Sequence, residues 1–358
     1  MSLPSSIVSQ CLRITKRDNV TIFHYPHSTP MAEDIAEECF KKGADVMLDL
    51  YTERYHLSYL KELPVEILRK PSPFCRALAE VSTVQIFLGG VYDPSILKKF
   101  PPEKEAATSE GETKAHFPIS RQRKIRILSV NTSLVTEPRA KVYGFNFQKW
   151  KGMVERASAI DYDLLAKTGR KLQEGLAGAK AIRVTGRETD LTFEVSGRKW
   201  LVSDGVIDRK DVEEGNLQDE IPAGSITVCP IEGSAEGTVT YNSQLPFMGE
   251  KVGRLKLAFK GGRIKTLSGD PSIGRLKRIW NASSGDKDKI ATFTIGFNPR
   301  ASSGFVSNNI VAGAVTIGIG ENRGIGGKNK SGFGFAHTLM RATVKADGKT
   351  VVSRGRLV

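Results

Sequence analysis

Residues 221–237 read IPAGSITVCPIEGSAEG and place a short β-prone segment between two turns. Pro222 and Gly224 mark the first turn, and Cys229-Pro230 begins the second. Glycine and proline interrupt regular structure, and a short strand between them can bring its backbone and small side chains close to a ligand. The stretch therefore predicts a strand flanked by turns. A purely structural role is the simpler interpretation, and contact with a ligand is the alternative.

Upstream of this stretch, short apolar runs alternate with helical patterns. Apolar runs occur at residues 20–24, 44–50, 84–88 and 124–130, and amphipathic segments lie between them. Strands that alternate with helices are typical of a parallel sheet with crossover helices. No GxGxxG motif links a first strand to a helix, so we predict no dinucleotide cofactor. Residues 101–116 are polar and charged, which predicts a surface loop.

From about residue 181 onward, short β-prone segments alternate with turns such as Lys260-Gly261-Gly262 and Ala346-Asp347-Gly348. Glycine-containing turns of this kind join antiparallel strands. The sequence therefore predicts an α/β protein with two domains. Residues 1–155 form a doubly wound α/β domain, and residues 156–358 form a β-rich α+β domain. The boundary lies within a helical span.

Length and composition agree with two domains. The chain has 358 residues, of which 39% are hydrophobic. No apolar run approaches the roughly 20 residues that span a bilayer, and the first residues lack the pattern of a signal peptide. The four cysteines form no CxxC pair, which favours reduced thiols in the cytoplasm over a cysteine-based zinc site.

The formal net charge of +14 permits binding of anions or nucleic acid. The basic residues are nevertheless dispersed, without interleaved aromatic residues and without a helix-turn-helix or zinc-finger motif. We therefore expect a generally basic enzyme surface and no membrane partner, with nucleic-acid binding as the runner-up interpretation.

Five segments, in order, give the sequence a family resemblance. They read RETDLTF (187–193), PAGSITVCP (222–230), IATFTIGFNP (290–299), GAVTIGIGEN (313–322) and GGKNKS (326–331). They resemble the segments GTDLTF, PxGEVFTAP, AELGIGTNP, GTVHIALGDN and GGxNxS of the aminopeptidase T family of dinuclear metallopeptidases. The resemblance implies the aminopeptidase T type of fold, a homodimer, and a peptide or other small molecule as ligand.

The resemblance also implies two metal ions held by three Glu, two His and one Asp, but this chain departs from that pattern. The first three Glu positions fall on Ser225, Thr292 and Asn309, and the first His falls on Thr316. The final His-x-Asp falls on Gly334 and Ala336 or, with an insertion, on His337 and Leu339.

Divalent cations need several anionic oxygens or imidazoles. Neutral hydroxyls and an amide do not neutralise two such ions, so we predict that the two-metal site is lost and that no cofactor is bound. A single divalent metal held by His337 with Glu321 is the alternative.

Three functions remain open at this point. The first is a metal-independent, hydrolase-like enzyme with Ser225 or Cys229 as nucleophile, His337 as base and Glu321 (or Glu232 or Glu236) as acid-base partner. Side chains that are two or four residues apart on an extended strand point to the same side. Ser225 and Cys229 are four residues apart and would therefore share a side. A buried, inert Cys229 is the simpler interpretation.

The second function is a binding protein or catalytically silent paralogue. Its ligand would be anionic and held by the glycine-rich residues 318–334 with Arg323, Lys328 and Lys330, because backbone amides and nearby cations attract anions. The third is a metal-dependent aminopeptidase, or an oxygenase-like relative with one metal. His337-Thr338-Leu339 lacks the Asp that a late His-x-Asp motif would need.

Overall fold

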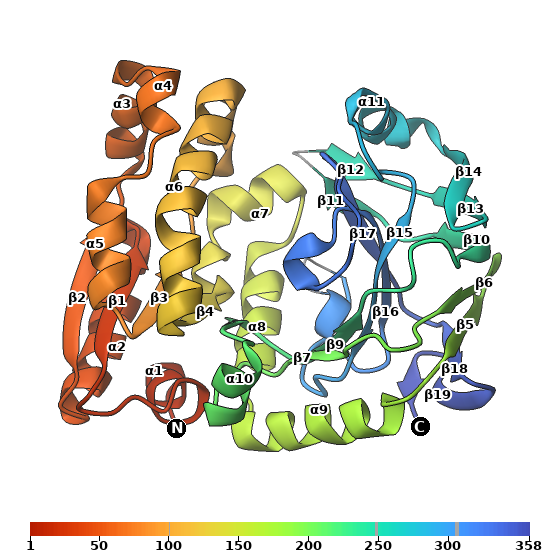
Figure 1. Cartoon of the computed structure of the whole chain (residues 1–358), viewed down its shortest axis with the longest axis horizontal. Coiled ribbons are helices and arrows are strands. Elements are labelled where there is room, and N and C mark those ends of the chain that lie inside the picture. Colours follow the sequence, from red (N-terminus) through yellow and green to blue (C-terminus); the bar gives the residue numbers. More distant parts are fainter. Residues whose placement is uncertain (100, 248–249, 305–307) are drawn as a thin grey trace. The chain divides into compact units, whose positions relative to one another are not determined.

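The computed structural model describes the chain except residues 100, 248–249 and 305–307 (Figure 1). The chain divides into two compact units. Unit 1 comprises Met1–Asp163 and Gly205–Pro222, and unit 2 comprises Leu164–Asp204 and Ala223–Val358. The change of unit therefore falls near the start of helix α9 (Tyr162–Leu176), eight residues beyond the expected boundary, and a short later segment returns to unit 1.

Unit 1 is built on a parallel five-stranded sheet with the order β2-β1-β3-β4-β8. The strands are β1 (Asn19–His24), β2 (Asp45–Leu50), β3 (Val84–Leu88), β4 (Arg126–Val130) and β8 (Gln218–Ile221). This order is that of flavodoxin-like, doubly wound sheets. Helices α5 and α6 lie on one face, and α2 lies on the other (Figure 1). The predicted doubly wound architecture is confirmed.

The helices of unit 1, apart from α1 at the start of the chain, lie in the connections between the strands. They are α1 (Leu3–Ser6), α2 (Thr29–Lys41), α3 (Glu53–Glu62), α4 (Val65–Leu68), α5 (Pro73–Val81), α6 (Pro102–Arg123), α7 (Glu137–Tyr143), α8 (Phe147–Ser158) and α10 (Arg209–Glu214). A π-helical turn, η1 (Ile7–Cys11), follows α1, and a 3-10 turn, η4 (Asn131–Leu134), follows β4.

The prediction of a surface loop at residues 101–116 is wrong, because residues 102–116 belong to the 22-residue helix α6. Ala, Glu and Lys are strong helix formers, and a proline is tolerated in the first helical turn. The helix also packs: Ala107 is buried with Leu60 and Leu68. A Cβ at Gly111 would lie 2.3 Å from the carbonyl oxygen of Leu68, so glycine permits this close approach. The polar composition of this segment therefore did not distinguish an exposed loop from a helix with one packed side.

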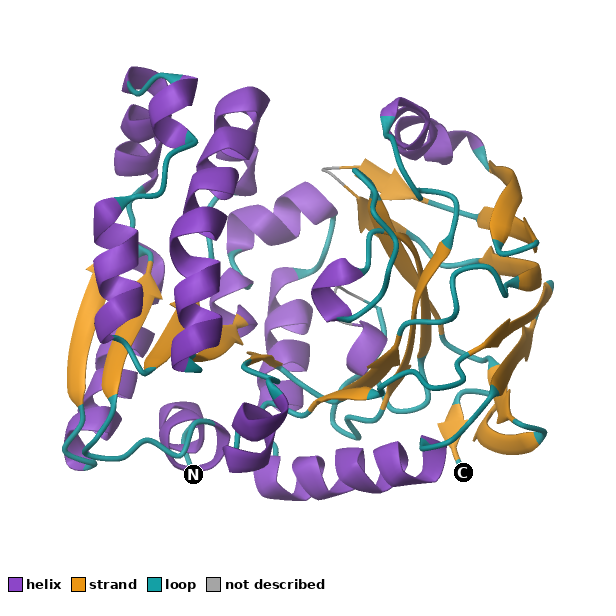
Figure 2. Ribbon diagram, viewed as in Figure 1, coloured by secondary structure: helices purple, strands orange, loops and turns teal. Residues whose placement is uncertain are grey.

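Unit 2 contains two large antiparallel sheets (Figure 2). The eight-stranded sheet has the order β14-β13-β10-β6-β5-β18-β19-β20 and the five-stranded sheet the order β17-β16-β15-β9-β7. A third, two-stranded sheet pairs β11 with β12. The predicted β-rich, mainly antiparallel second domain is therefore confirmed.

The strands of the eight-stranded sheet are β5 (Ala181–Gly186), β6 (Thr189–Glu194), β10 (Glu236–Tyr241), β13 (Leu255–Lys260), β14 (Arg263–Gly269), β18 (Thr343–Ala346), β19 (Lys349–Ser353) and β20 (Arg356–Leu357). Those of the five-stranded sheet are β7 (Leu201–Ser203), β9 (Ser225–Val228), β15 (Ile290–Gly296), β16 (Val315–Gly320) and β17 (Gly334–Leu339). The remaining elements are β11 (Leu245–Phe247), β12 (Glu250–Val252), α11 (Gly274–Ala282), η3 (Pro94–Lys99) and four further 3-10 turns.

Aromatic residues pack the two large sheets of unit 2 against each other. Phe193 of β6 lies 5.2 Å from Phe293 of β15 between ring centroids. The hydroxyl of the buried Tyr241, on β10, donates to the carbonyl oxygen of Ile317, on β16, at 3.0 Å. The core between the two sheets is made of side chains from one face of each sheet. The side chains on the other face of the five-stranded sheet are not needed for this core, so a functional site can be formed there. Among the described residues, no helix is long and apolar enough to cross a membrane.

Candidate functional site: the hydroxyl face of the five-stranded sheet

Four threonines form a row across the five-stranded sheet. The strand pairing places Thr227 opposite Thr294, Thr294 opposite Thr316, and Thr316 opposite Thr338. The hydroxyls of Thr227 and Thr294 are 2.8 Å apart, and those of Thr316 and Thr338 are 2.7 Å apart. Paired β-branched residues with bonded hydroxyls stabilise such a sheet. The row therefore fixes a polar surface on one side of the sheet.

We call this side the hydroxyl face. Side chains alternate between faces along a strand, so residues two apart share a face. Its Ser and Thr residues are Ser203, Ser225, Thr227, Thr292, Thr294, Thr316 and Thr338. Three of the positions to which the family resemblance assigns metal ligands, Ser225, Thr292 and Thr316, are thus brought together on one face.

Two hydroxyls of this face have no hydrogen bond to another described residue, namely those of Ser225 and Thr292. A Cβ at Gly318 would lie 2.2 Å from Thr292 Oγ1, so the glycine leaves room for that hydroxyl. Ser225 pairs with Gly296, and a Cβ at Gly296 would lie 2.6 Å from the carbonyl oxygen of Asn309, in the turn η6 (Asn308–Ile310). Asn309 thus lies beside the end of the hydroxyl face.

His337 lies on the opposite face of the sheet. Its ring is 2% exposed and stacks on Tyr241 with 5.1 Å between centroids. Nε2 donates to the carbonyl oxygen of Ser243 at 2.9 Å, and Nδ1 accepts from the amide of Thr338 at 2.8 Å. Burial lowers the pKa of this imidazole. The structure does not bring His337 together with Ser225 or Cys229, and both ring nitrogens are already used.

The same alternation bears on the two possible positions of the final His-x-Asp. Gly334 and Ala336 lie on the hydroxyl face, since Ala336 pairs with Gly318 and Gly334 with Gly320. His337 and Leu339 point to the other side. The strand register favours the alignment without an insertion, because the shift from Gly334 to His337 is an odd number of residues and moves the side chain to the other face.

Cys229 follows β9 and is 4% exposed. Its thiol donates weakly to the carbonyl oxygen of Ile325 at 3.5 Å. Burial raises the pKa of this thiol to about 11, helped by the charge of Glu232 and opposed by that of Arg198. Because the thiolate is the nucleophile, these surroundings make Cys229 inert at neutral pH.

We expect Cys229 to resist alkylation in the folded protein. A pKa of about 11 leaves roughly 3 thiolates in 10,000 at pH 7.5. The half-buried Cys75 should react with iodoacetamide before the buried Cys11, Cys39 and Cys229. Peptide mass spectrometry of briefly alkylated protein measures the order. Labelling of Cys229 ahead of Cys75 would show that Cys229 is an activated nucleophile.

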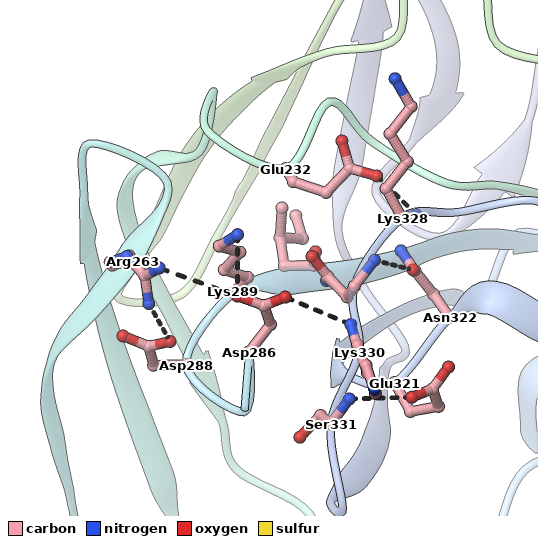
Figure 3. Close-up of polar contacts among 12 residues, drawn as sticks. Glu232, Arg263, Asp286, Asp288, Lys289, Glu321, Asn322, Lys328, Lys330 and Ser331 are labelled. Carbon is pink, nitrogen blue, oxygen red and sulfur yellow. Dashed lines mark hydrogen bonds and ion pairs between the residues drawn. The ribbon is translucent and has the colours of Figure 1, made fainter. Parts of the chain in front are cut away.

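The glycine-rich residues 318–334 use their backbone amides within the chain (Figure 3). Four consecutive amides donate to side chains: Lys328 N to Glu232 (2.8 Å), Asn329 N to Asn322 (2.8 Å), Lys330 N to Asp286 (3.2 Å) and Ser331 N to Glu321 (2.8 Å). The expected cradle of amides for an external anion is therefore occupied by the chain's own oxygens, three of them carboxylates.

Glu321 and Arg323 form an ion pair at the surface, with 2.8 Å between Nε and Oε1. The hydrogen bond from Arg323 lowers the pKa of Glu321 to about 2. A carboxyl with so low a pKa is a poor proton donor at neutral pH. The structure thus gives Glu321 and Arg323 a shared structural role, and gives Lys328 and Lys330 backbone anchors beside them.

Sequence reasoning missed the threonine row. A signal was present, because Ser225-x-Thr227 and Thr292-x-Thr294 both alternate hydroxyl residues with large apolar ones. Their mutual alignment depends on pairing between strands that lie far apart in the chain, which one sequence does not reveal.

The comparisons with known proteins agree with this fold. The family model described as thermophilic metalloprotease (M29) matches residues 3–285. Wild-type AmpT from Thermus thermophilus has a similar structure, with a TM-score of 0.77 and 17% identity, covering 99% of this chain and 98% of that one. The 2,5-dihydroxypyridine dioxygenase from Pseudomonas putida KT2440 is also similar, with a TM-score of 0.65 and 16% identity over 99% and 96% of the two chains.

No curated protein matches this chain. At such low identities the two solved structures speak for the fold alone. The family model matches most of the chain and therefore shows the family as well as the fold. The chain belongs to the M29 family of thermophilic metalloproteases.

Proposed function

We propose that this chain is an M29 member that has lost two-metal peptide hydrolysis and binds a small polar molecule on its hydroxyl face. The observation that carries the proposal is the donor set. Ser225, Thr292 and Thr316 share one face, and each offers a neutral hydroxyl where the family resemblance implies a carboxylate or an imidazole. Neutral oxygens do not hold two divalent cations. In the described part of the chain, no three His, Cys, Asp or Glu side chains gather in a metal-binding arrangement.

A silent binding protein fits this geometry better than a metal-independent enzyme. A serine nucleophile needs a base within hydrogen-bond reach. His337 lies on the far side of the sheet, and the thiol of Cys229 is held protonated. The hydroxyls of the buried Ser225 and the half-buried Thr292 instead have no hydrogen bond to another described residue, which supports a binding role without nucleophilic attack. We infer a neutral polar ligand, such as a peptide backbone, because the face itself carries no cation among its described side chains.

The decisive experiment measures metal content and aminopeptidase activity together. We expect well below one metal ion per chain after purification without chelators, and no turnover with added cobalt, zinc or manganese. About two metal ions per chain with turnover would overturn the proposal. The variant Ser225→Glu/Thr292→Glu/Thr316→His should gain metal affinity. The control Thr192→Glu/Thr266→Glu, at exposed positions of the eight-stranded sheet, should not.

Ligand binding has its own test, with the dipeptide leucylglycine as probe in ligand-observed NMR. Binding without hydrolysis, weakened by Ser225→Ala/Thr292→Val but not by Thr266→Val, supports the silent paralogue. Binding that ignores the first variant would place the ligand elsewhere. We further infer a cytoplasmic homodimer, with the free state of all four cysteines as support for a reducing compartment.

A further inference from the structure

Unit 1 contains a cavity of about 920 Å³ that none of the preceding arguments uses. It is lined by residues of α1, the start of α2, the turn η4 and the end of α8. His27 and Ser28, which follow β1, and Thr132 and Ser133, which follow β4, form part of its wall. In open α/β sheets, ligands bind beyond the carboxyl ends of the strands. The volume falls within the range of small-molecule sites.

Two polar atoms in the cavity wall lack hydrogen-bond partners in the described part of the chain. Thr132 Oγ1 is buried and unpaired. His27 Nε2 lies 3.1 Å from the carbonyl oxygen of Ser133 and must donate to it, which leaves Nδ1 as an acceptor. Burial, with the nearby charge of Arg139, lowers the pKa of His27 against the opposing effects of the Ser133 hydrogen bond and the charge of Glu53, and this favours the neutral ring. Buried polar groups without partners call for a bound molecule or water.

The charges around the cavity are mainly negative. Asp34, Glu155 and Asp161 contribute three carboxylates, and among the described lining residues Lys151 and the amino group of Met1 contribute two positive charges. Asp34 has no ion pair or hydrogen bond to another described residue, and the contact between Lys151 and Glu155 is long, at 3.8 Å. This is a local reversal in a chain whose net charge is +14. A cation therefore gains more at this cavity than over the rest of the surface.

The remainder of the wall includes apolar side chains. These apolar side chains are Met31 of α2, Val135 after η4, Val154 of α8, and Ile160 after α8. Binding sites for organic molecules combine such apolar walls with a few polar groups that orient the ligand. A metal ion or a fully hydrated polyamine would leave these side chains without a partner.

We propose that this cavity binds a small organic cation, an ammonium group carried on an apolar body. The acceptors Asp34, Glu155 and His27 Nδ1 suit the N–H donors of the ammonium group, and the apolar walls suit the body. The proposal concerns unit 1 alone and is independent of the function assigned to the hydroxyl face.

The test uses three probes with similar apolar bodies: 2-phenylethylamine, 2-phenylethanol and 3-phenylpropionate. Isothermal titration calorimetry with the full-length protein should detect the amine at millimolar concentration, with the alcohol weaker and the acid absent. The affinity for the amine should fall about tenfold in Asp34→Asn/Glu155→Gln, because two exposed carboxylates each contribute modestly.

The matched control is Glu37→Gln, an exposed position one turn further along α2 that does not line the cavity. It should leave the affinity unchanged. Val154→Phe should weaken binding by filling the cavity, and circular dichroism melting verifies that each variant is folded. Equal binding of all three probes, an unchanged affinity in Asp34→Asn/Glu155→Gln, or no binding of the amine would each overturn the proposal.

Discussion

Replacing Asp18 with alanine is expected to destabilise unit 1 by about 3–5 kcal/mol, because it leaves a buried guanidinium without its counter-ion. Asp18 and Arg126 form an ion pair whose side chains are 9% and 17% exposed. The carboxylate also accepts from the amide of Thr15 and the hydroxyl of Thr83, each at 2.8 Å. Arg126 donates in addition to the carbonyl oxygen of Leu12. One carboxylate thus joins the segments at the start of β1, β3 and β4.

Hydrogen exchange measured by mass spectrometry suits a two-unit chain, in which a single unfolding free energy is not well defined. Peptides from β1, β3 and β4 should exchange faster in Asp18→Ala, while peptides from unit 2 keep their rates. The control is Asp190→Asn, which removes the partner of Arg183 in a pair with both side chains 57% exposed. An exposed pair contributes about 1 kcal/mol or less. Equal effects of the two changes would contradict the argument.

The contribution of Asp18 depends on pH in a definite direction. Burial alone would raise its pKa, but the hydrogen bond from Thr15, the charge of Arg126 and the bonds from Thr83 and Arg126 outweigh burial, so the pKa lies below 3.8. The stabilisation is therefore complete above the unfolded-state pKa and is lost as the pH falls through the lower folded-state pKa. The difference between wild type and Asp18→Asn should shrink below about pH 4.

The sequence predicted the strands of unit 1 well where they are apolar. The runs at residues 20–24, 44–50, 84–88 and 124–130 correspond to β1 to β4. Strand β8, with the sequence QDEI, has no such pattern and was not predicted. It belongs to the sheet because it pairs with β4 across almost ninety residues of chain. A polar edge strand such as β8 forms because it pairs with a neighbouring strand. A pattern read over a few consecutive residues does not reveal that neighbouring strand.

The residues of the candidate site also fall into those that the sequence predicted and those that depend on contacts with distant parts of the chain. The resemblance led to Ser225, Thr292 and Thr316, and their shared face follows from the strand register. The role of His337 depended on the alignment of the final His, which falls on Gly334 or, after an insertion, on His337; in a strand, a shift by an odd number of residues moves a side chain to the other face. The occupied amides of residues 328–331 could not be foreseen either, because two of their four partners, Glu232 and Asp286, come from other parts of the chain.

The backbone amides of residues 328–331 show that a glycine-rich segment can bind carboxylates of its own protein in place of an external anion. Backbone amides in a glycine-rich turn attract anions, whether the anion is a ligand or a carboxylate of the protein. Here Glu232 fills the place an external anion would take, and its other oxygen binds Arg198. Removing Glu232 should therefore both weaken the fold and expose an anion site.

Replacing Glu232 with alanine is expected to destabilise unit 2 by about 3–5 kcal/mol. Its carboxylate lies 2.5 Å from Arg198 Nη2, and the two side chains are only 14% and 15% exposed. The change leaves the charge of Arg198 and the amide of Lys328 without partners. Added inorganic phosphate should then raise the melting temperature of Glu232→Ala more than that of the wild type, because a ligand that binds the folded state stabilises it.

Two further variants separate the causes. Glu232→Gln keeps an acceptor for the amide of Lys328 but removes the charge, so it should be destabilised less than Glu232→Ala and respond less to phosphate. Glu321→Ala removes the surface ion pair with Arg323 and the acceptor of the Ser331 amide, and it should cost less than Glu232→Ala because the side chain of Arg323 is exposed. Differential scanning fluorimetry across a phosphate series measures all three. If phosphate shifts Glu232→Ala and the wild type equally, then Glu232 does not occupy an anion site, and its bond to Lys328 is only a structural anchor of the glycine-rich segment.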